Sequence, residues 1–100
     1  MKVYISGAIT GDSNYKEKFQ KAKKDLEANG YRAVNPAEFE LPEGATWEDY
    51  MKQDLALLLN CDGIYMLKDW KQSRGARIEQ FLAQELHLQI LYEPFLGETK

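Results

Sequence analysis

The chain shows its fold most plainly in two neighbouring stretches, Gly63-Ile64-Tyr65-Met66-Leu67 and Ser73-Arg74-Gly75-Ala76-Arg77-Ile78-Glu79. The first is a short apolar run, as in a buried strand, and the second opens a helix that continues to Leu86 with apolar residues at helical spacing. Ser73 is a suitable N-cap, and small residues leave the N–H groups of the first turn open to an anion. The two stretches therefore predict a strand, a short loop and a helix whose start can bind a phosphate.

Glu79 is an unusual residue for its place on this helix. It lies on the apolar stripe and has no basic residue three or four positions away; the stripe consists of Gly75, Ala76, Leu82, Ala83 and Leu86. An ionised carboxylate there costs stability, and its side chain leans toward the anion site at the helix start. We therefore consider Glu79 a candidate nucleophile. The alternative is that Glu79 merely offsets the helix dipole, while Ser73 and Gly75 only mark the start of the helix and bind no ligand.

The composition is that of an ordinary globular protein, with 44% hydrophobic and 29% charged residues and a formal net charge of −3. Nucleic acid is therefore not an expected partner, and the lysines between residues 16 and 24 predict a solvated helix face. The single Cys61 excludes an internal disulfide, and no Cys/His cluster has zinc-ligand spacing. We expect no cofactor, no metal and a reducing, cytoplasmic location. We also expect no signal peptide, because Met1-Lys2 opens directly into a short strand pattern, and no membrane partner, because no apolar run approaches the ~20 residues of a bilayer span.

The remaining chain alternates strand and helix patterns, without a linker or repeat, and predicts a single domain over residues 1–100. A chain this short buries little surface, so we expect a homo-oligomer, a dimer or higher, with Trp47, Tyr50 and Met51 at the interface. The predicted elements are a strand at 2–6, a glycine-flanked loop at 7–11, a helix at 14–29 closed by Gly30, a strand at 31–35, a lid-length loop to 45, a helix at 46–60, a strand at 63–67, a helix from 74, a strand at 88–93 and a polar tail at 97–100.

This alternation predicts a small doubly wound α/β domain of the Rossmann-like or flavodoxin-like kind. We expect a four-stranded parallel sheet in the order 2-1-3-4, flanked by three helices. Ligands bind such sheets at the carboxyl ends of the strands, where the order reverses between the first and third strands. The loops at 7–11 and 68–75 both lie there, and their convergence favours the functional interpretation of Glu79.

Two segments also resemble a known family. Tyr4-Ile5-Ser6-Gly7-Ala8-Ile9-Thr10-Gly11 is similar to the first strand and loop of the deoxynucleoside 5′-monophosphate N-glycosidases, and Ser73-x-Gly75-x-x-x-Glu79 to their Ser-x-Gly-x-x-x-Glu segment. Over nearly its whole length the chain resembles the nucleoside 2-deoxyribosyltransferase superfamily, most closely its short DUF4406 branch. The resemblance implies that Glu79 is the nucleophile and that Asp62 lies near the reacting sugar. It also implies a substrate-binding set of Ser6, Gly7, Ala8, Ile9, Thr10, Gly11, Ser73 and Gly75.

The chain departs from the monophosphate N-glycosidases in the first loop, where Thr10 replaces an arginine; Arg74 or Arg77 is a candidate to compensate. Trp70 resembles a tryptophan of the short branch and would either stack on a nucleobase or pack on its own helix.

The sequence leaves two interpretations open for each of two further residues, Tyr4 and Asn35. Tyr4 is either a hydrogen-bond partner of the Glu79 carboxylate or, by strand alternation, a core residue. Asn35, before Pro36, either points its amide into the site or simply ends the second strand.

Together these features predict an N-glycosidic-bond enzyme, a hydrolase or a 2-deoxyribosyltransferase, that releases the free base from a nucleoside or nucleoside 5′-monophosphate. A carboxylate would stabilise the oxocarbenium-like sugar, and an acid would protonate the leaving base. Glu79 fills the first role, and Asp62, Asp69 or a water held by the loop fills the second. The alternatives are a nucleotide-binding module of the same fold without turnover, and an enzyme that cleaves another glycoside such as a dinucleotide cofactor.

Overall fold

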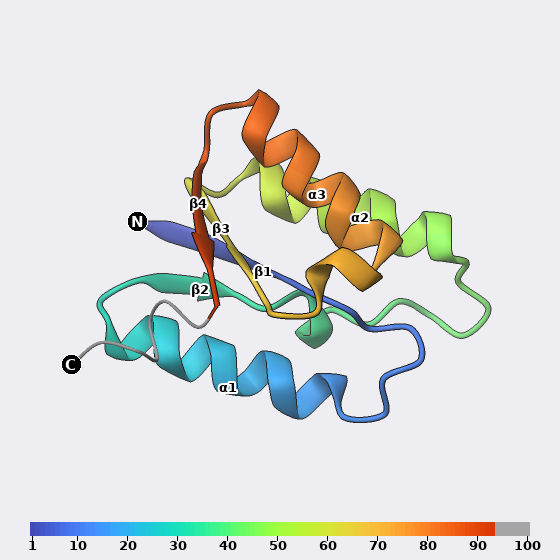
Figure 1. The fold of residues 1–100 in the computed structure, drawn as a ribbon. Coiled ribbons are helices and arrows are strands. Elements are labelled where there is room, and N and C mark those ends of the chain that lie inside the picture. The colour runs from blue at the N-terminus through green and yellow to red at the C-terminus, as the bar shows by residue number, and fades with distance from the viewer. Residues whose placement is uncertain (94–100) are drawn as a thin grey trace.

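The computed structural model describes residues 1–93 and has the predicted alternation of strands and helices (Figure 1). The predicted tail at 97–100 lies outside the described residues. The elements are β1 Lys2–Ser6, α1 Tyr15–Ala28, β2 Arg32–Val34, a 3-10 turn Pro36–Glu38, α2 Trp47–Leu59, β3 Gly63–Met66, a 3-10 turn Trp70–Gln72, α3 Arg74–Glu85 and β4 Gln89–Tyr92.

All four strands are parallel and their order is β2-β1-β3-β4, which confirms the predicted topology. Ser6 at the end of β1 is level with Met66 at the end of β3. The order reverses between these two strands, so the loops that follow them meet at one edge of the sheet. This edge carries the candidate site.

The two faces of the sheet bury separate cores, because successive side chains of a strand point to opposite faces. Helix α1 covers one face and helices α2 and α3 cover the other, as Figure 1 shows. The α1 core contains Val3, Ile5, Phe19, Ala22, Leu26, Tyr65, Leu67 and Leu91. The core under α2 and α3 contains Tyr4, Leu58, Cys61, Ile64, Met66, Ala76 and Ala83.

The helix ends follow the capping chemistry of the sequence. Thr46 and Asp49 form a reciprocal capping box at the start of α2, and Gly30 follows α1 with a φ of 88°. Asn35 follows β2 and accepts a hydrogen bond from the Ala37 N–H at 2.9 Å. Of its two interpretations, the structure therefore supports the one in which Asn35 ends the strand. The apolar stripe of α3 is shorter than predicted, since Leu86 is 50% exposed.

The predicted solvated lysine face of α1 is wrong at two positions. Lys18 and Lys23 are only 23% and 24% exposed and pair with residues outside the helix, whereas Lys21 is exposed as expected. Among the described helices, none combines the length and the hydrophobicity that crossing a bilayer requires.

Candidate active site

A cavity of about 420 Å³ opens at the carboxyl edge of the sheet, where the topology predicted a ligand site. Its floor is the end of β1 and the first turns of α3, and its walls are α1, the 36–45 segment and the start of α2. The lining residues are Tyr4, Ile5, Gly7, Ile9, Thr10, Tyr15, Phe19, Pro36, Ala37, Phe39, Glu40, Ala45, Thr46, Trp47, Tyr50, Met51, Asp54, Ser73, Gly75, Ala76 and Glu79.

Glu79 lies at the floor of this cavity with only 4% of its surface exposed. The Tyr4 hydroxyl donates to Glu79 Oε2 at 2.7 Å, and the Ser6 hydroxyl donates to Oε1 at 2.6 Å. Tyr4 is therefore both a buried core residue and the hydrogen-bond partner of the carboxylate. The two interpretations of Tyr4 do not exclude each other. The two hydroxyls fix the orientation of the carboxylate and assist its ionised form.

Burial raises the pKa of Glu79 to about 7, although the hydrogen bonds from Ser6 and Tyr4 lower it and the nearby charge of Asp54 raises it slightly. Burial, with the Glu79 charge second, also raises the pKa of Tyr4 well above its usual range. Tyr4 consequently stays protonated and remains a hydrogen-bond donor at neutral pH. A carboxyl group that titrates near neutrality inside a cavity is typical of an active site.

Asp54 of α2 is a site residue that the sequence interpretation missed. It lines the same cavity, is 8% exposed, and its Oδ1 accepts no hydrogen bond from any residue that the structure describes. Burial raises the pKa of Asp54 to about 6. A buried oxygen without a partner is costly, and an incoming ligand with a donor or a basic atom could satisfy it.

The loop after β1 enters the cavity in part. Gly7, Ile9 and Thr10 line it, whereas Ala8 and Gly11 do not. Within residues 1–93 the backbone N–H groups of Gly7, Ile9 and Thr10 donate to no acceptor, so they remain available to a ligand. A Cβ at Gly7 would lie 2.7 Å from Leu67 Cδ1, which explains why this position has no side chain.

Ser73 and Gly75 also line the cavity, at the start of α3. The Ser73 hydroxyl accepts a hydrogen bond from the Ala76 N–H at 3.1 Å and caps the helix as predicted. A Cβ at Gly75 would lie 3.0 Å from the sulfur of Met51. A side chain at Gly75 would therefore press first on Met51, which is itself part of the lining.

Asp62 is not part of this site. It precedes β3 and accepts a hydrogen bond from the Lys2 N–H at 2.9 Å, at the amino ends of the strands. Four residues of strand separate it from the carboxyl edge, a distance of roughly 13 Å. The expected catalytic role of Asp62 is therefore wrong for this geometry.

Trp70 and Asp69 are also outside the cavity lining. The Trp70 ring packs against Tyr92 of β4 with ring centroids 6.0 Å apart, so it packs within the protein, but on a neighbouring strand and not on its own helix as expected. Asp69 accepts a hydrogen bond from the Ala8 N–H at 3.0 Å and forms an ion pair with Lys18. This engagement removes Asp69 from the candidate proton donors.

The start of α2 faces the cavity. Trp47, Tyr50 and Met51 were expected at a subunit interface, but all three line the site, so they give no reason to place an interface there. The guanidinium of Arg74 stacks on the Trp47 ring, 4.4 Å from its centroid. Arg77 donates to the Lys71 carbonyl at 2.8 Å, so of the two arginines Arg74 is the one beside a lining residue. The oligomeric state stays a prediction.

The 36–45 segment contributes five residues to the cavity lining, and contacts hold it on both sides. On the α1 side it makes two ion pairs, Lys16–Glu40 and Lys23–Glu38, each at 2.8 Å. On the α2 side it makes two hydrogen bonds, from the Leu41 N–H to the Tyr50 hydroxyl at 3.0 Å and from Gln53 Nε2 to the Phe39 carbonyl at 2.6 Å.

The described residues contain no group of three or more His, Cys, Asp or Glu side chains that could hold a metal ion. The cavity offers two buried carboxyl groups, Asp54 and Glu79, together with hydroxyls and open N–H groups.

Comparison with known proteins agrees with this architecture. The model of a family described as "Domain of unknown function (DUF4406)" matches residues 1–92. Among solved structures, a 2-deoxyribosyltransferase from the psychrotolerant bacterium Bacillus psychrosaccharolyticus superposes with a TM-score of 0.72, at 18% sequence identity, over 92% of this chain and 71% of that one. No curated protein matches. At this identity the likeness establishes a common fold.

Proposed function

The chain belongs to the DUF4406 family, and we propose that it is an N-glycosidic-bond enzyme that releases the free base from a nucleoside or nucleoside 5′-monophosphate. One observation carries the proposal: a buried carboxylate held by two hydroxyls shares a cavity with a second, unpaired carboxyl group. The structural neighbour is a 2-deoxyribosyltransferase, which is consistent with chemistry at a sugar carbon.

Glu79 is the nucleophile in this proposal. The hydroxyls of Tyr4 and Ser6 hold its two oxygens in fixed positions, so little reorganisation is needed when positive charge develops on the sugar. One Glu79 oxygen attacks the anomeric carbon, the C–N bond breaks and its electron pair leaves with the base. The result is a glycosyl ester that a second acceptor must resolve.

Asp54 is the proton donor in this proposal, in place of the donors considered from the sequence. Burial brings both pKa values near neutrality, to about 6 for Asp54 and about 7 for Glu79, so each carboxyl group is partly protonated in this range. A sugar that develops positive charge beside Glu79 favours ionised Glu79 and leaves the proton on Asp54. Asp54 gives this proton to the leaving base and then accepts one from the incoming water or base.

The rest of the cavity fits the remaining parts of such a substrate. Open N–H groups of the Gly7–Thr10 loop and the Ser73 hydroxyl at the α3 N-terminus suit a phosphate or sugar hydroxyls. The partly exposed aromatic side chains of Tyr15 and Phe39, which line the cavity, suit a flat base. Both hydrolysis and base exchange are compatible with this arrangement.

Base release is the measurement that tests the proposal. The protein is incubated with the common nucleosides and their 5′-monophosphates, with and without a second free base, and the products are separated by chromatography. Glu79→Gln should fold and bind the same nucleotides but release no base, because an amide cannot form the ester. Equal turnover by both proteins would refute Glu79 as the nucleophile. Binding without turnover by the wild type would favour the nucleotide-binding module.

A further inference from the structure

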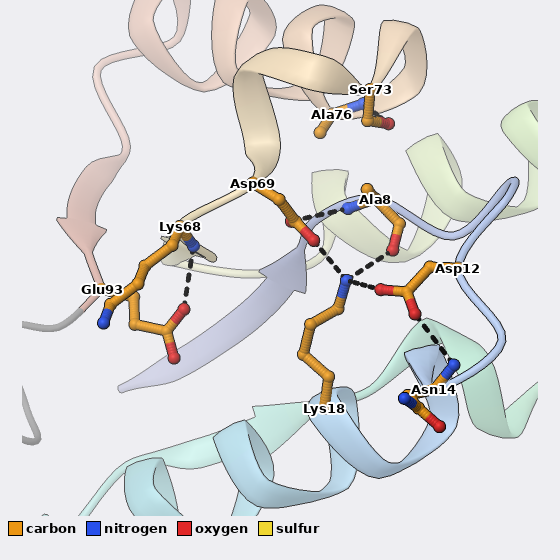
Figure 2. A network of polar contacts seen from close by, with 9 residues as sticks. All are labelled: Ala8, Asp12, Asn14, Lys18, Lys68, Asp69, Ser73, Ala76 and Glu93. Atoms are coloured by element: carbon orange, nitrogen blue, oxygen red, sulfur yellow. Dashed lines mark hydrogen bonds and ion pairs between the residues drawn. The ribbon is translucent and has the colours of Figure 1, made fainter.

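Lys18 of α1 occupies an unusual position for a lysine on a helix surface. Its ammonium group donates to three acceptors: the Ala8 carbonyl at 2.9 Å, Asp12 Oδ2 at 2.6 Å and Asp69 Oδ2 (Figure 2). An ammonium group has three N–H donors, so all of them are used. Only 23% of the Lys18 side chain is exposed, compared with 72% for Lys21 on the same helix.

These bonds join the two loops that carry the site. Asp12 belongs to the loop after β1, and Asp69 belongs to the loop between β3 and α3. Asp69 Oδ1 also accepts the Ala8 N–H at 3.0 Å, so charged groups hold both polar groups of Ala8. The neighbours of Ala8 in the chain, Gly7 and Ile9, line the cavity.

The contact of the Lys18 ammonium group with Asp12 and Asp69 is charged and partly shielded from water, which makes it stronger than an exposed ion pair. Burial lowers the pKa of Lys18, but its hydrogen bonds to Asp12 and Asp69 raise that pKa more, and the net change is upward. The hydrogen bond from Lys18 lowers the pKa of Asp12. Lys18 and Asp12 therefore stay charged around neutral pH.

We propose that Lys18 is a positioning residue of the active site, which holds the Ala8 peptide and thereby presents the Gly7–Thr10 loop to the substrate. This inference rests on the proposed function, since it assigns a role in the same site. Lys18 does not line the cavity and touches no reacting atom. It acts through the loop backbone, whose free N–H groups at Gly7, Ile9 and Thr10 are the ligand donors.

The mechanism predicts an effect on KM more than on kcat. Without Lys18 the loop samples other conformations, and apparent affinity falls by the fraction of time that it is correctly placed. Saturating substrate selects the correct loop conformation, so kcat recovers. A purely structural role would instead reduce the amount of folded enzyme, which lowers the apparent kcat and leaves KM unchanged.

Lys18→Met tests this mechanism because it keeps the length of the side chain and removes every donor. With 2′-deoxynucleoside 5′-monophosphates as probes, we expect KM to rise about tenfold and kcat to change by less than about twofold, as a loop correctly placed roughly a tenth of the time requires. Lys21→Met is the matched control, since its exposed pair with Asp25 lies outside the site, and should leave both constants unchanged.

Asp69→Asn provides a second variant if Lys18→Met folds poorly, and it should also raise KM. Because Lys18 and Asp69 belong to one network, the double variant should be little worse than the single ones. Effects that multiply, or a fall in kcat at constant KM, would overturn the proposal.

Hydrogen exchange of the Ala8 amide gives a readout that needs no activity. Lys18→Met should speed this exchange about tenfold in the free protein, and Lys21→Met should not, because only the first frees the loop. Unchanged exchange in Lys18→Met would overturn the proposal. If the wild type releases no base from any probe, the proposed function fails, and the exchange measurement alone decides whether Lys18 holds the loop.

Discussion

Asp54→Asn should make the protein more stable above about pH 6 while it stops base release. Asp54 is 8% exposed and its Oδ1 has no partner among the described residues, so the folded state disfavours the ionised form. Burial raises the pKa of Asp54 from 3.8 to about 6. The folded protein therefore holds the Asp54 proton over a pH range in which the unfolded chain has lost it.

The size of the effect follows from proton linkage. Well below pH 3.8 Asp54 is protonated in both states and contributes nothing. As the pH rises from 3.8 to about 6, the free energy of unfolding falls, because the unfolded state releases the proton first. The pKa difference of roughly two pH units corresponds to a penalty of about 3 kcal/mol at 1.36 kcal/mol per unit. Asparagine cannot ionise and is free of this penalty.

The assay is urea unfolding of wild type and Asp54→Asn at about pH 4 and about pH 8, with base release measured in parallel. The stability difference between the two proteins should grow by about 2.5 kcal/mol from the lower to the higher pH, because a small part of the penalty is already present at about pH 4. Any cost of the amide itself is present at both pH values and cancels. Asp62→Asn, at an exposed position, should show no such growth and should retain base release. A difference independent of pH, or normal turnover by Asp54→Asn, would refute the reasoning.

Tyr4→Phe removes a hydrogen bond that lowers the pKa of Glu79, so the acidic limb of the base-release profile should move to higher pH; an unmoved limb would contradict this role. Gly7→Ala should lower the free energy of unfolding by about 1 to 3 kcal/mol in urea titrations, because its Cβ would overlap Leu67. Ser73→Ala should weaken monophosphates by about 1.5 to 3 kcal/mol in calorimetry and nucleosides much less, if Ser73 contacts the phosphate.

Much of the fold could be predicted because each element carries its own local signal. The alternation of strands and helices leaves few parallel topologies, and the observed order is the expected one. Element ends differ from prediction by a residue or two, as in β4 and α1, since frayed ends have no strong sequence signal.

The site could be predicted only in part. Glu79 was found because a carboxylate on an apolar helix stripe is costly, and Asp54 satisfies the same criterion. It lies three positions after Met51 and four before Leu58, both buried on α2. Asp62 could have been rejected from the sequence, because a residue before a parallel strand lies at the edge opposite the site.

Two other features depend on tertiary contacts that the sequence does not display. Trp70 faces Tyr92, which is distant from it in the chain, so no local pattern separates packing from ligand stacking. In the sequence Lys18 resembles the lysines near it. Its role becomes visible only in the folded structure, where two loops meet around its ammonium group.

The 36–45 segment is attached to α1 and to α2 by different kinds of contact, so ionic strength should affect its two sides unequally. Its α1 side is held by ion pairs, one of them with both side chains more than 60% exposed, and dissolved salt screens such pairs. Its α2 side is held by uncharged hydrogen bonds, which salt affects far less. Added salt should therefore weaken the ionic attachment of the segment to α1 more than its attachment to α2.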